Sequence, residues 1–164
     1  PETSLYYATT GFLGEMGVFS VGVGTTRPFH YVLAPWIDGE LIAKKLNHRN
    51  LPGVKFIPAN VRSYYGLYQQ KRISGVQLII DEASIYDPVL TGIAVLKTLW
   101  EVYPDKIPLS NPSIVSAIDT LLGTSYVRTA VQKGVPLFQI YNDIQLKLLE
   151  YKKRRKEFLI YPEN

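Results

Sequence analysis

The sequence of 164 residues contains no cysteine, and this absence excludes several classes of protein. Disulfide scaffolds, zinc ribbons, iron–sulfur proteins and thiol enzymes all need cysteine as a ligand, a cross-link or a nucleophile. The sequence also lacks an apolar run near the roughly 20 residues of a membrane-spanning helix, and no signal-peptide pattern opens it. The first residue is Pro1 rather than methionine, so we expect the chain to be a piece of a longer protein.

The apolar content of the sequence is sufficient for one hydrophobic core. Of all residues, 46% are apolar, and a chain of this length buries roughly two-thirds of the surface that it exposes when unfolded. No internal repeat, low-complexity segment or linker divides the chain. The sequence therefore predicts a single domain over residues 1–164.

The positive net charge is confined to one short segment. The chain has 18 basic and 14 acidic residues, which gives a net charge of +4. The run Lys152-Lys153-Arg154-Arg155-Lys156 carries +5, so the remaining residues sum to −1. No aromatic residue interrupts the run, and clustered cations at the end of a helix are typical of a solvated helix terminus. We therefore expect no nucleic-acid partner.

Strand patterns dominate the first half of the sequence. The candidate strands are residues 4–8, 18–23, 29–33, 54–57 and 76–80, and the last is an apolar run typical of a buried central strand. Residues 9–17 form a glycine-punctuated connection. One helix is predicted over residues 38–47, where the side chain of Asp38 can cap the free N–H groups of the first turn.

Helical periodicity dominates the second half. From Pro88 the apolar residues recur at a period of about 3.6, and Pro104 ends that helix. Ser113 is the predicted N-cap of a helix that ends before Gly123, and Thr124 or Ser125 caps a short helix that ends at Gly134. The last helix opens at Pro136 with a predicted buried face of Leu137, Ile140, Tyr141, Ile144 and Leu148. This order predicts an α+β fold, a mixed β-sheet from the first half covered by helices from the second half.

The segment from Gly22 to Arg27 has the composition of a ligand-binding loop. A dinucleotide-binding fingerprint would need a third glycine at the position of Arg27 and a helix after it, and Pro28 follows instead. Two alternatives stay open for this segment. The glycines allow close backbone approach to a ligand that Thr25, Thr26 and Arg27 could bind, or the segment is a tight turn whose arginine pairs with a carboxylate.

The sequence carries few catalytic or metal-binding patterns. The two histidines, His30 and His48, have no carboxylate at ligand spacing, and no serine lies in a nucleophile elbow. We expect no metal and no cofactor. Asp81 and Glu82 follow the predicted central strand, but adjacent side chains of an extended segment point to opposite faces. At most one of them is a site residue, and an acidic turn is the alternative.

Ten short pieces of the sequence match one family in order and spacing. They are residues 22–29 (Gly-x-Gly-Thr-Thr-Arg-Pro-Phe), 34–38 (Ala-Pro-Trp-Ile-Asp), 46–47, 51–56 (Leu-Pro-Gly-Val-Lys-Phe), Tyr68 with Lys71, 75–77 (Gly-Val-Gln), Pro88 with Thr91-Gly92, 103–105 (Tyr-Pro-Asp), 121–123 (Leu-Leu-Gly) and 158–161 (Phe-Leu-Ile-Tyr). Together they resemble the C-terminal part of the bacterial exo-β-N-acetylmuramidase family, long catalogued as a domain of unknown function. The resemblance covers essentially the whole chain.

The resemblance implies a longer, two-domain protein. In that family an N-terminal Rossmann-like domain carries the catalytic carboxylates, and the C-terminal domain closes a cleft against it to release N-acetylmuramic acid from peptidoglycan fragments. This chain would then be the cleft-forming part of such a glycoside hydrolase, inactive by itself. Its implied partners are the N-terminal domain and a peptidoglycan-derived sugar, and an extracytoplasmic location is slightly favoured. The implied substrate contacts are Glu15, Ser20, Gly24, Thr25, Thr26, Arg27 and Glu82, with Glu15 the expected partner of Arg27.

Several positions depart from the family pattern. Glu15 and Ser20 are kept, but a Thr-Asn pair between them is lost, and Val18 stands in place of its asparagine. Val23 replaces an arginine, Ile79 replaces a histidine, and Glu82 replaces an aspartate. Such changes predict an altered substrate or a lost activity. The alternative function is therefore a non-catalytic carbohydrate-binding or scaffolding module that kept the fold.

Overall fold

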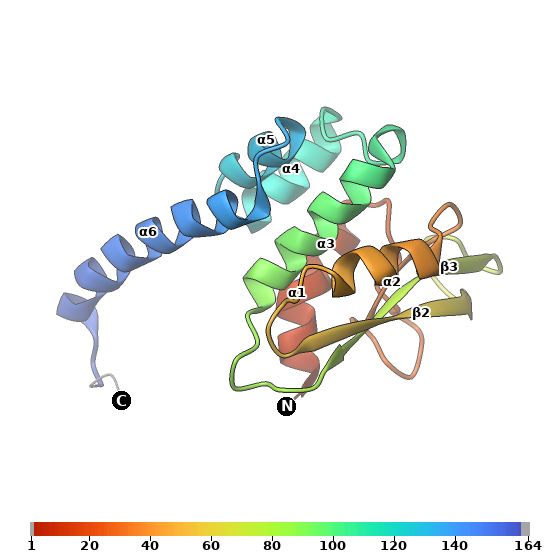
Figure 1. Cartoon of the computed structure of the whole chain (residues 1–164), viewed down its shortest axis with the longest axis horizontal. Coiled ribbons are helices and arrows are strands. Elements are labelled where there is room, and N and C mark those ends of the chain that lie inside the picture. Colours follow the sequence, from red (N-terminus) through yellow and green to blue (C-terminus); the bar gives the residue numbers. More distant parts are fainter. Residues whose placement is uncertain (1, 162–164) are drawn as a thin grey trace.

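The computed structural model describes residues 2–161 (Figure 1). Its elements in chain order are α1 (Glu2–Glu15), β1 (Tyr31–Ala34), α2 (Gly39–Asn47), β2 (Val54–Arg62), β3 (Arg72–Ile80), α3 (Pro88–Val102), α4 (Pro112–Leu121), α5 (Tyr126–Gln132) and α6 (Leu137–Arg155), with 3₁₀ turns at Pro104–Lys106 and Lys156–Phe158. Helix α2 packs on β2 and β3, while α1 packs against α3, α4 and β1. The α+β class is confirmed, although helices of the first half also cover the sheet.

The three strands of the described residues form an antiparallel sheet in the order β1-β3-β2. The prediction of a mixed sheet was wrong in this detail. A short connection, residues 63–71, joins β2 to β3, and a connection of this length allows only antiparallel pairing, because a parallel pair needs a crossover of a dozen or more residues. The central place of β3 was predicted correctly, and Val76 and Leu78 on it are fully buried.

The predicted strand at residues 4–8 and the irregular segment that follows it are one helix, α1. This helix shows no clear apolar stripe, because Thr9 and Thr10 are buried with its core residues while Tyr7 is exposed. The hydroxyls of Thr9 and Thr10 donate to the carbonyls of Leu5 and Tyr6 one turn earlier, which satisfies them inside the helix. The buried residues lie on one broad face, but two polar threonines are part of it and the apolar Tyr7 and Ala8 lie exposed outside it, which hides the 3.6-residue pattern by which a helix is recognised.

Residues 18–23 were also predicted as a strand, and in the structure they form a loop. Only Ser20 pairs in a strand-like manner, exchanging hydrogen bonds of 2.8 and 2.9 Å with Leu33. The predicted strand at residues 29–33 begins later, at Tyr31. Phe29 has a φ of 70°, a left-handed conformation that a strand cannot contain.

The predicted helices of the remaining chain are confirmed, with one changed cap. Asp38 accepts a hydrogen bond from the backbone N–H of Leu41 and starts α2. The N-cap of α4 is Asn111 rather than Ser113, since the Asn111 side chain accepts from the N–H of Ser113. Gly123 follows α4 with a φ of 65°, as expected for a residue that ends a helix.

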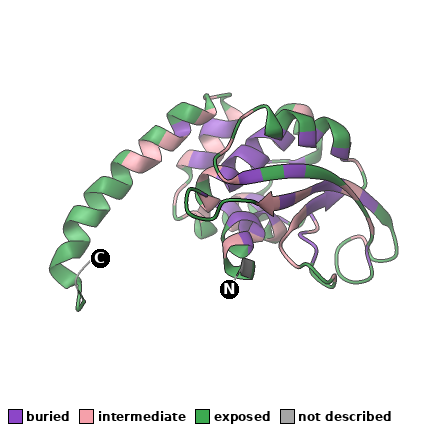
Figure 2. Cartoon of the chain, turned by 60° about the horizontal axis from the view of Figure 1, so that its bottom comes forward, coloured by how far each residue is buried: buried purple, intermediate pink, exposed green. Residues whose placement is uncertain are grey.

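Helix α6 contacts the rest of the domain through its first three turns, the last of these contacts being Lys147 over the ring of Tyr126, 5.3 Å from the ring centroid. Of its five predicted buried residues, Ile140 alone is buried, and Leu148 is exposed. The hydroxyl of Tyr141 donates to Asp87 at 2.9 Å, and that of Tyr126 donates to Asp143. Beyond these contacts the helix runs away from the other elements (Figure 2). No helix of the described residues is long and apolar enough to cross a membrane.

The hydrogen bond between Tyr126 and Asp143 predicts a dependence of stability on alkaline pH. This hydrogen bond is the main reason that the pKa of Tyr126 is raised from 10.0 to about 12, and partial burial is the second reason. Because folding raises this pKa, the hydrogen bond contributes fully to the stability of the fold below about pH 10. That contribution is lost as the pH rises through about 12. We expect the urea midpoint to fall less between pH 10 and 12 in Tyr126→Phe than in the wild type. Tyr64→Phe, an exposed control, should follow the wild type, and equal slopes in all three proteins would contradict the prediction.

Candidate functional site

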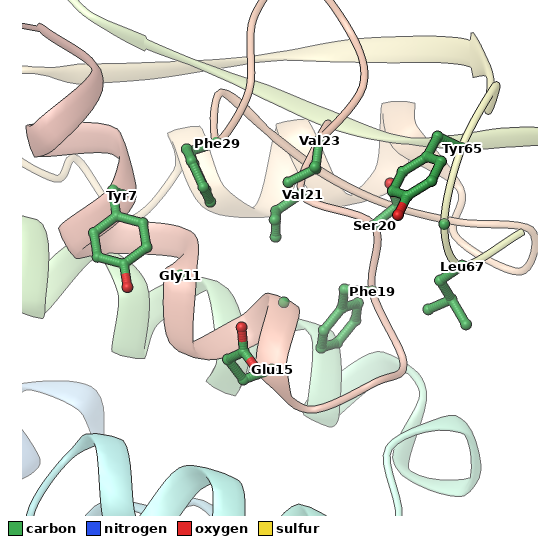
Figure 3. Close-up of a pocket in the computed structure, with 12 residues that line it drawn as sticks. Tyr7, Gly11, Glu15, Phe19, Ser20, Val21, Val23, Phe29, Tyr65 and Leu67 are labelled. Carbon is green, nitrogen blue, oxygen red and sulfur yellow. The ribbon is translucent and has the colours of Figure 1, made fainter.

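A hollow of about 240 Å³ lies where α1 meets the loop of residues 18–24 and the loop of residues 63–71 (Figure 3). Tyr7 and Phe29 stand at one end of it, and Tyr65 and Leu67 stand at the other. It is lined by Tyr7, Gly11, Gly14, Glu15, Phe19, Ser20, Val21, Val23, Phe29, Tyr65, Gly66 and Leu67. Its volume is near the lower end for small-molecule sites, roughly 300 Å³, which fits one sugar-sized ring.

Helix α1 forms one wall of the hollow through a face rich in glycine. Tyr7, Gly11, Gly14 and Glu15 share this face, because residues three and four apart lie one above the other on a helix. A Cβ atom on Gly14 would lie 2.9 Å from the Val21 side chain, so a glycine at this position lets the loop approach the helix closely. Glu15 ends the helix and is exposed. Helix α1 therefore brings a carboxylate to a hollow that is also lined by aromatic side chains and the hydroxyl of Ser20.

Tyr65 closes the far end of the hollow and depends on a long-range contact. The loop that carries it is tied to residues 18–24 by the hydroxyl of Tyr68, which donates to the carbonyl of Val18 at 3.0 Å. A Cβ on Gly24 would lie 3.2 Å from the Cβ of Tyr65, so the two loops touch there. Tyr65 is nevertheless 65% exposed, and a ligand could therefore pack against its ring.

The segment from Gly22 to Arg27 borders this hollow as a tight turn. Thr25 donates its hydroxyl to the carbonyl of Gly22 at 2.7 Å and accepts from the N–H of Arg27 at 3.1 Å. Gly22 and Gly24 have φ values of 80° and 87°, which glycine adopts without strain. The hydroxyl of Thr25 therefore holds the turn together. Only Val23 of this segment lines the hollow, while Thr26 and Arg27 are exposed beside it.

The expected pairing of Arg27 with Glu15 was wrong. The ion pairs among residues 2–161 are Arg49–Glu101, Lys55–Asp81, Lys97–Glu101 and Arg128–Asp119. Arg27 is in none of them, and it is exposed.

Glu82 lies in a second, more open hollow of about 680 Å³, together with Asp81, Lys55 and the turn at Gly53. Lys55 contacts Asp81 at 2.7 Å, and this hydrogen bond lowers the pKa of Asp81. A general acid in glycoside hydrolysis needs a raised pKa, so Asp81 is unsuited to that role. The side chain of Glu82 accepts from Ser84 at 3.4 Å. The structure therefore does not bring Glu82 together with Glu15 and Ser20 in one site.

The three apolar departures from the family pattern differ in position. Val23 lies in the first hollow and is half exposed. Val18 accepts a hydrogen bond from Tyr68 through its backbone carbonyl, and its partly buried side chain packs against the core. Ile79 lies on β3 opposite Lys55, which belongs to the second hollow. Only the departure at Val23 changes the first hollow directly.

The sequence reasoning missed the aromatic residues of the site. Tyr7 was missed because residues 9–17 were predicted as an irregular connection, which gives no reason to place Tyr7 beside Gly11 and Glu15. Tyr65 belongs to a polar, aromatic stretch that no pattern assigned to a site. Its neighbour Gly66, with a φ of 74°, marks the tight turn that turns this loop toward the hollow.

Three comparisons with known proteins agree with this structure. A family model described as exo-β-N-acetylmuramidase NamZ, C-terminal, matches residues 5–161. The chain is 31% identical over 160 residues to the peptidoglycan β-N-acetylmuramidase NamZ of Bacillus subtilis, covering 98% of this chain and 38% of that protein. It superposes on the crystal structure of a DUF1343 family protein from Bacteroides fragilis with a TM-score of 0.86 at 24% identity, covering 99% of this chain and 43% of that one.

The chain thus spans less than half the length of either relative, and the family match extends over nearly all of it. The resemblance found in the sequence is confirmed. The chain belongs to the family of C-terminal domains of the exo-β-N-acetylmuramidase NamZ.

Proposed function

We propose that this chain is the substrate-cleft part of a longer glycoside hydrolase that acts on peptidoglycan-derived amino sugars. The observation that carries the proposal is the hollow on α1, in which an exposed carboxylate and a hydroxyl lie between aromatic side chains. A sugar ring has apolar faces and a polar edge. Tyr65 and Tyr7 can pack against such faces, and Glu15 and Ser20 can bind hydroxyl or amide groups at the edge.

The proposal assigns the catalytic carboxylates to the N-terminal domain, the part of the relatives that this chain does not span. Glycoside hydrolysis usually needs two carboxyl groups that flank one bond at roughly 5–10 Å from each other. Glu15 is the only acidic residue among those that line the first hollow. Asp81 in the second hollow is held ionised by Lys55, as described above. We propose a location outside the cytoplasm, which rests on the similarity to a peptidoglycan-degrading family.

The test compares the isolated chain with the full-length polypeptide on a chromogenic N-acetylmuramyl glycoside. We expect turnover by the full-length protein and none by the isolated chain. Glu15→Gln removes a charged acceptor and should lower kcat/KM roughly 10- to 100-fold, because such hydrogen bonds contribute about 1.5–3 kcal/mol. Tyr65→Ala should weaken binding about fivefold through lost ring packing, worth about 1 kcal/mol. Tyr64→Ala is the matched control, since Tyr64 is 76% exposed and does not line the hollow.

Two outcomes would contradict the proposal. Turnover by the isolated chain that Asp81→Asn or Glu82→Gln abolishes would place the catalytic site in the second hollow. Sugar binding without turnover by the full-length protein would instead support the alternative, a non-catalytic carbohydrate-binding module. Val23 favours that alternative, because its side chain stands in the hollow where the family has an arginine.

A further inference from the structure

The C-terminal end of the chain, residues 146–161 (the arm), exposes an unusual amount of apolar surface. It begins after Asp143 and the partly buried Ile144, and near its start Lys147 still lies over the ring of Tyr126, 5.3 Å from the ring centroid (Figure 2). Its exposed apolar side chains are Leu146, Leu148, Leu149, Tyr151, Phe158, Leu159, Ile160 and Tyr161, and Ile160 is 90% exposed. An apolar patch of this extent is typical of an interaction surface.

The apolar side chains of the arm lie on two sides of the helix. Leu148 and Tyr151 follow Ile144 at intervals of four and three residues, so they continue the face that anchors the base of α6. Leu146 and Leu149 lie roughly half a turn away from that face. A surface helix of a soluble domain is normally apolar on one side only. A helix that is apolar on two sides is suited to lie between two surfaces.

We propose that the arm is the docking surface for the N-terminal domain of the same polypeptide. This inference rests on the proposed function, which gives the chain such a domain. The relatives support this occupant, because the family match runs to residue 161 and so includes the arm. The structural match covers 99% of this chain within a protein more than twice as long. The arm is thus a shared part of the domain in longer proteins.

The charges of the arm define the chemistry of the surface that it binds. Tyr151, Arg154, Arg155, Phe158 and Leu159 line a hollow on the arm, which combines aromatic and apolar groups with guanidinium groups. Lys152 and Lys153 add further positive charge, and residues 151–161 are exposed throughout. We therefore expect the N-terminal domain to present an apolar surface bordered by carboxylates. Charged rims of this kind affect orientation and association rate more than affinity.

The test measures amide hydrogen exchange of the arm in the isolated chain and in the full-length polypeptide. We expect amides 146–158 to exchange on the order of 100-fold more slowly in the full-length protein, because docking suppresses local opening of the helix. Exchange in α3, which is buried in both proteins, is the internal reference. Equal exchange of the arm in both proteins would overturn the proposal.

A pair of matched variants separates docking from folding. Leu146→Ser with Leu149→Ser should restore fast exchange of the arm in the full-length protein and leave α3 protected. Leu121→Ser, at an exposed site on α4, should change neither. Size-exclusion chromatography with light scattering tests the other occupant. A dimer of the isolated chain that Leu146→Ser with Leu149→Ser dissociates would show that a second copy covers the arm, against the proposal.

The same full-length protein distinguishes this inference from the proposed function. Turnover of the muramyl glycoside together with an unprotected arm would overturn the docking surface and leave the hydrolase intact. A protected arm without any turnover would overturn the proposed hydrolase function and leave the docking surface intact. Turnover with a protected arm supports both.

Discussion

Replacing Gly75 with alanine is expected to destabilise the domain by roughly 4 kcal/mol or more, enough to unfold most of it. Gly75 lies on the central strand β3, opposite Leu33 of β1. A Cβ at this position would lie 2.1 Å from the carbonyl oxygen of Val32 and 3.0 Å from the Cα of Leu33. Both are backbone atoms of a paired strand, so they cannot move aside as the end of a flexible side chain could.

The effect of Gly75→Ala is measured by urea unfolding followed by far-UV circular dichroism. Gly123→Ala is the matched control, because a Cβ there meets nothing within 4 Å although the φ is 65°. That control carries only the strain of a left-handed alanine, about 1 kcal/mol. If both variants lost the same free energy of unfolding, close packing of β1 on β3 would not be the reason that glycine is needed at position 75.

The elements that the sequence predicted correctly are those with local causes. Asp38 and the residues after it form a cap and an apolar stripe within one turn of each other, so α2 could be recognised from ten residues. The apolar run of β3 is continuous because helices and neighbouring strands cover it, and such a run predicts a central strand. In both cases the information needed lies inside the element itself.

Helix α1 could not be recognised in this way, because its environment is set by distant residues. A Cβ on Gly92 of α3 would lie 2.6 Å from the carbonyl oxygen of Thr9, so the two helices cross at close range. The hydroxyl of Thr9 also hydrogen-bonds with that of Tyr86. Threonines that face another helix look polar in the sequence, and they break the apolar pattern of a helix that is in fact buried.

The residues of the candidate site also differ in how far the sequence could predict them. Glu15 and Ser20 were found through the family resemblance, which compares positions rather than contacts. Tyr65 reaches the hollow only because Tyr68 binds Val18, fifty residues earlier in the chain. Glu82 was also placed in the site through the resemblance, but the end of β3 lies at the turn at Gly53, where the N–H groups of Asp81 and Glu82 both donate to the Gly53 carbonyl.

The second large effect is expected for Glu101→Gln, which should destabilise the domain by about 2 kcal/mol. Glu101 accepts from two cations, Lys97 at 2.9 Å and Arg49 at 2.8 Å. The side chain of Lys97 is only 6% exposed, so its ammonium group would stay buried without a carboxylate. Breaking a fully buried pair costs about 3–5 kcal/mol. The value is lower here because the side chain of Glu101 is 42% exposed and water can replace part of the interaction.

A second substitution shows whether the buried ammonium group is the cause. Lys97→Met replaces the charge with an apolar side chain of similar length, and such replacements of buried ions are often neutral or stabilising. We therefore expect Lys97→Met to recover most of the stability lost in Glu101→Gln, measured as the free energy of unfolding in urea. Arg49 keeps its hydrogen bond of 2.7 Å to Thr98 in all of these variants. If Lys97→Met added its own loss to that of Glu101→Gln instead, the pairing of Glu101 with Arg49, rather than with Lys97, would be the interaction that stabilises the junction of α2 and α3.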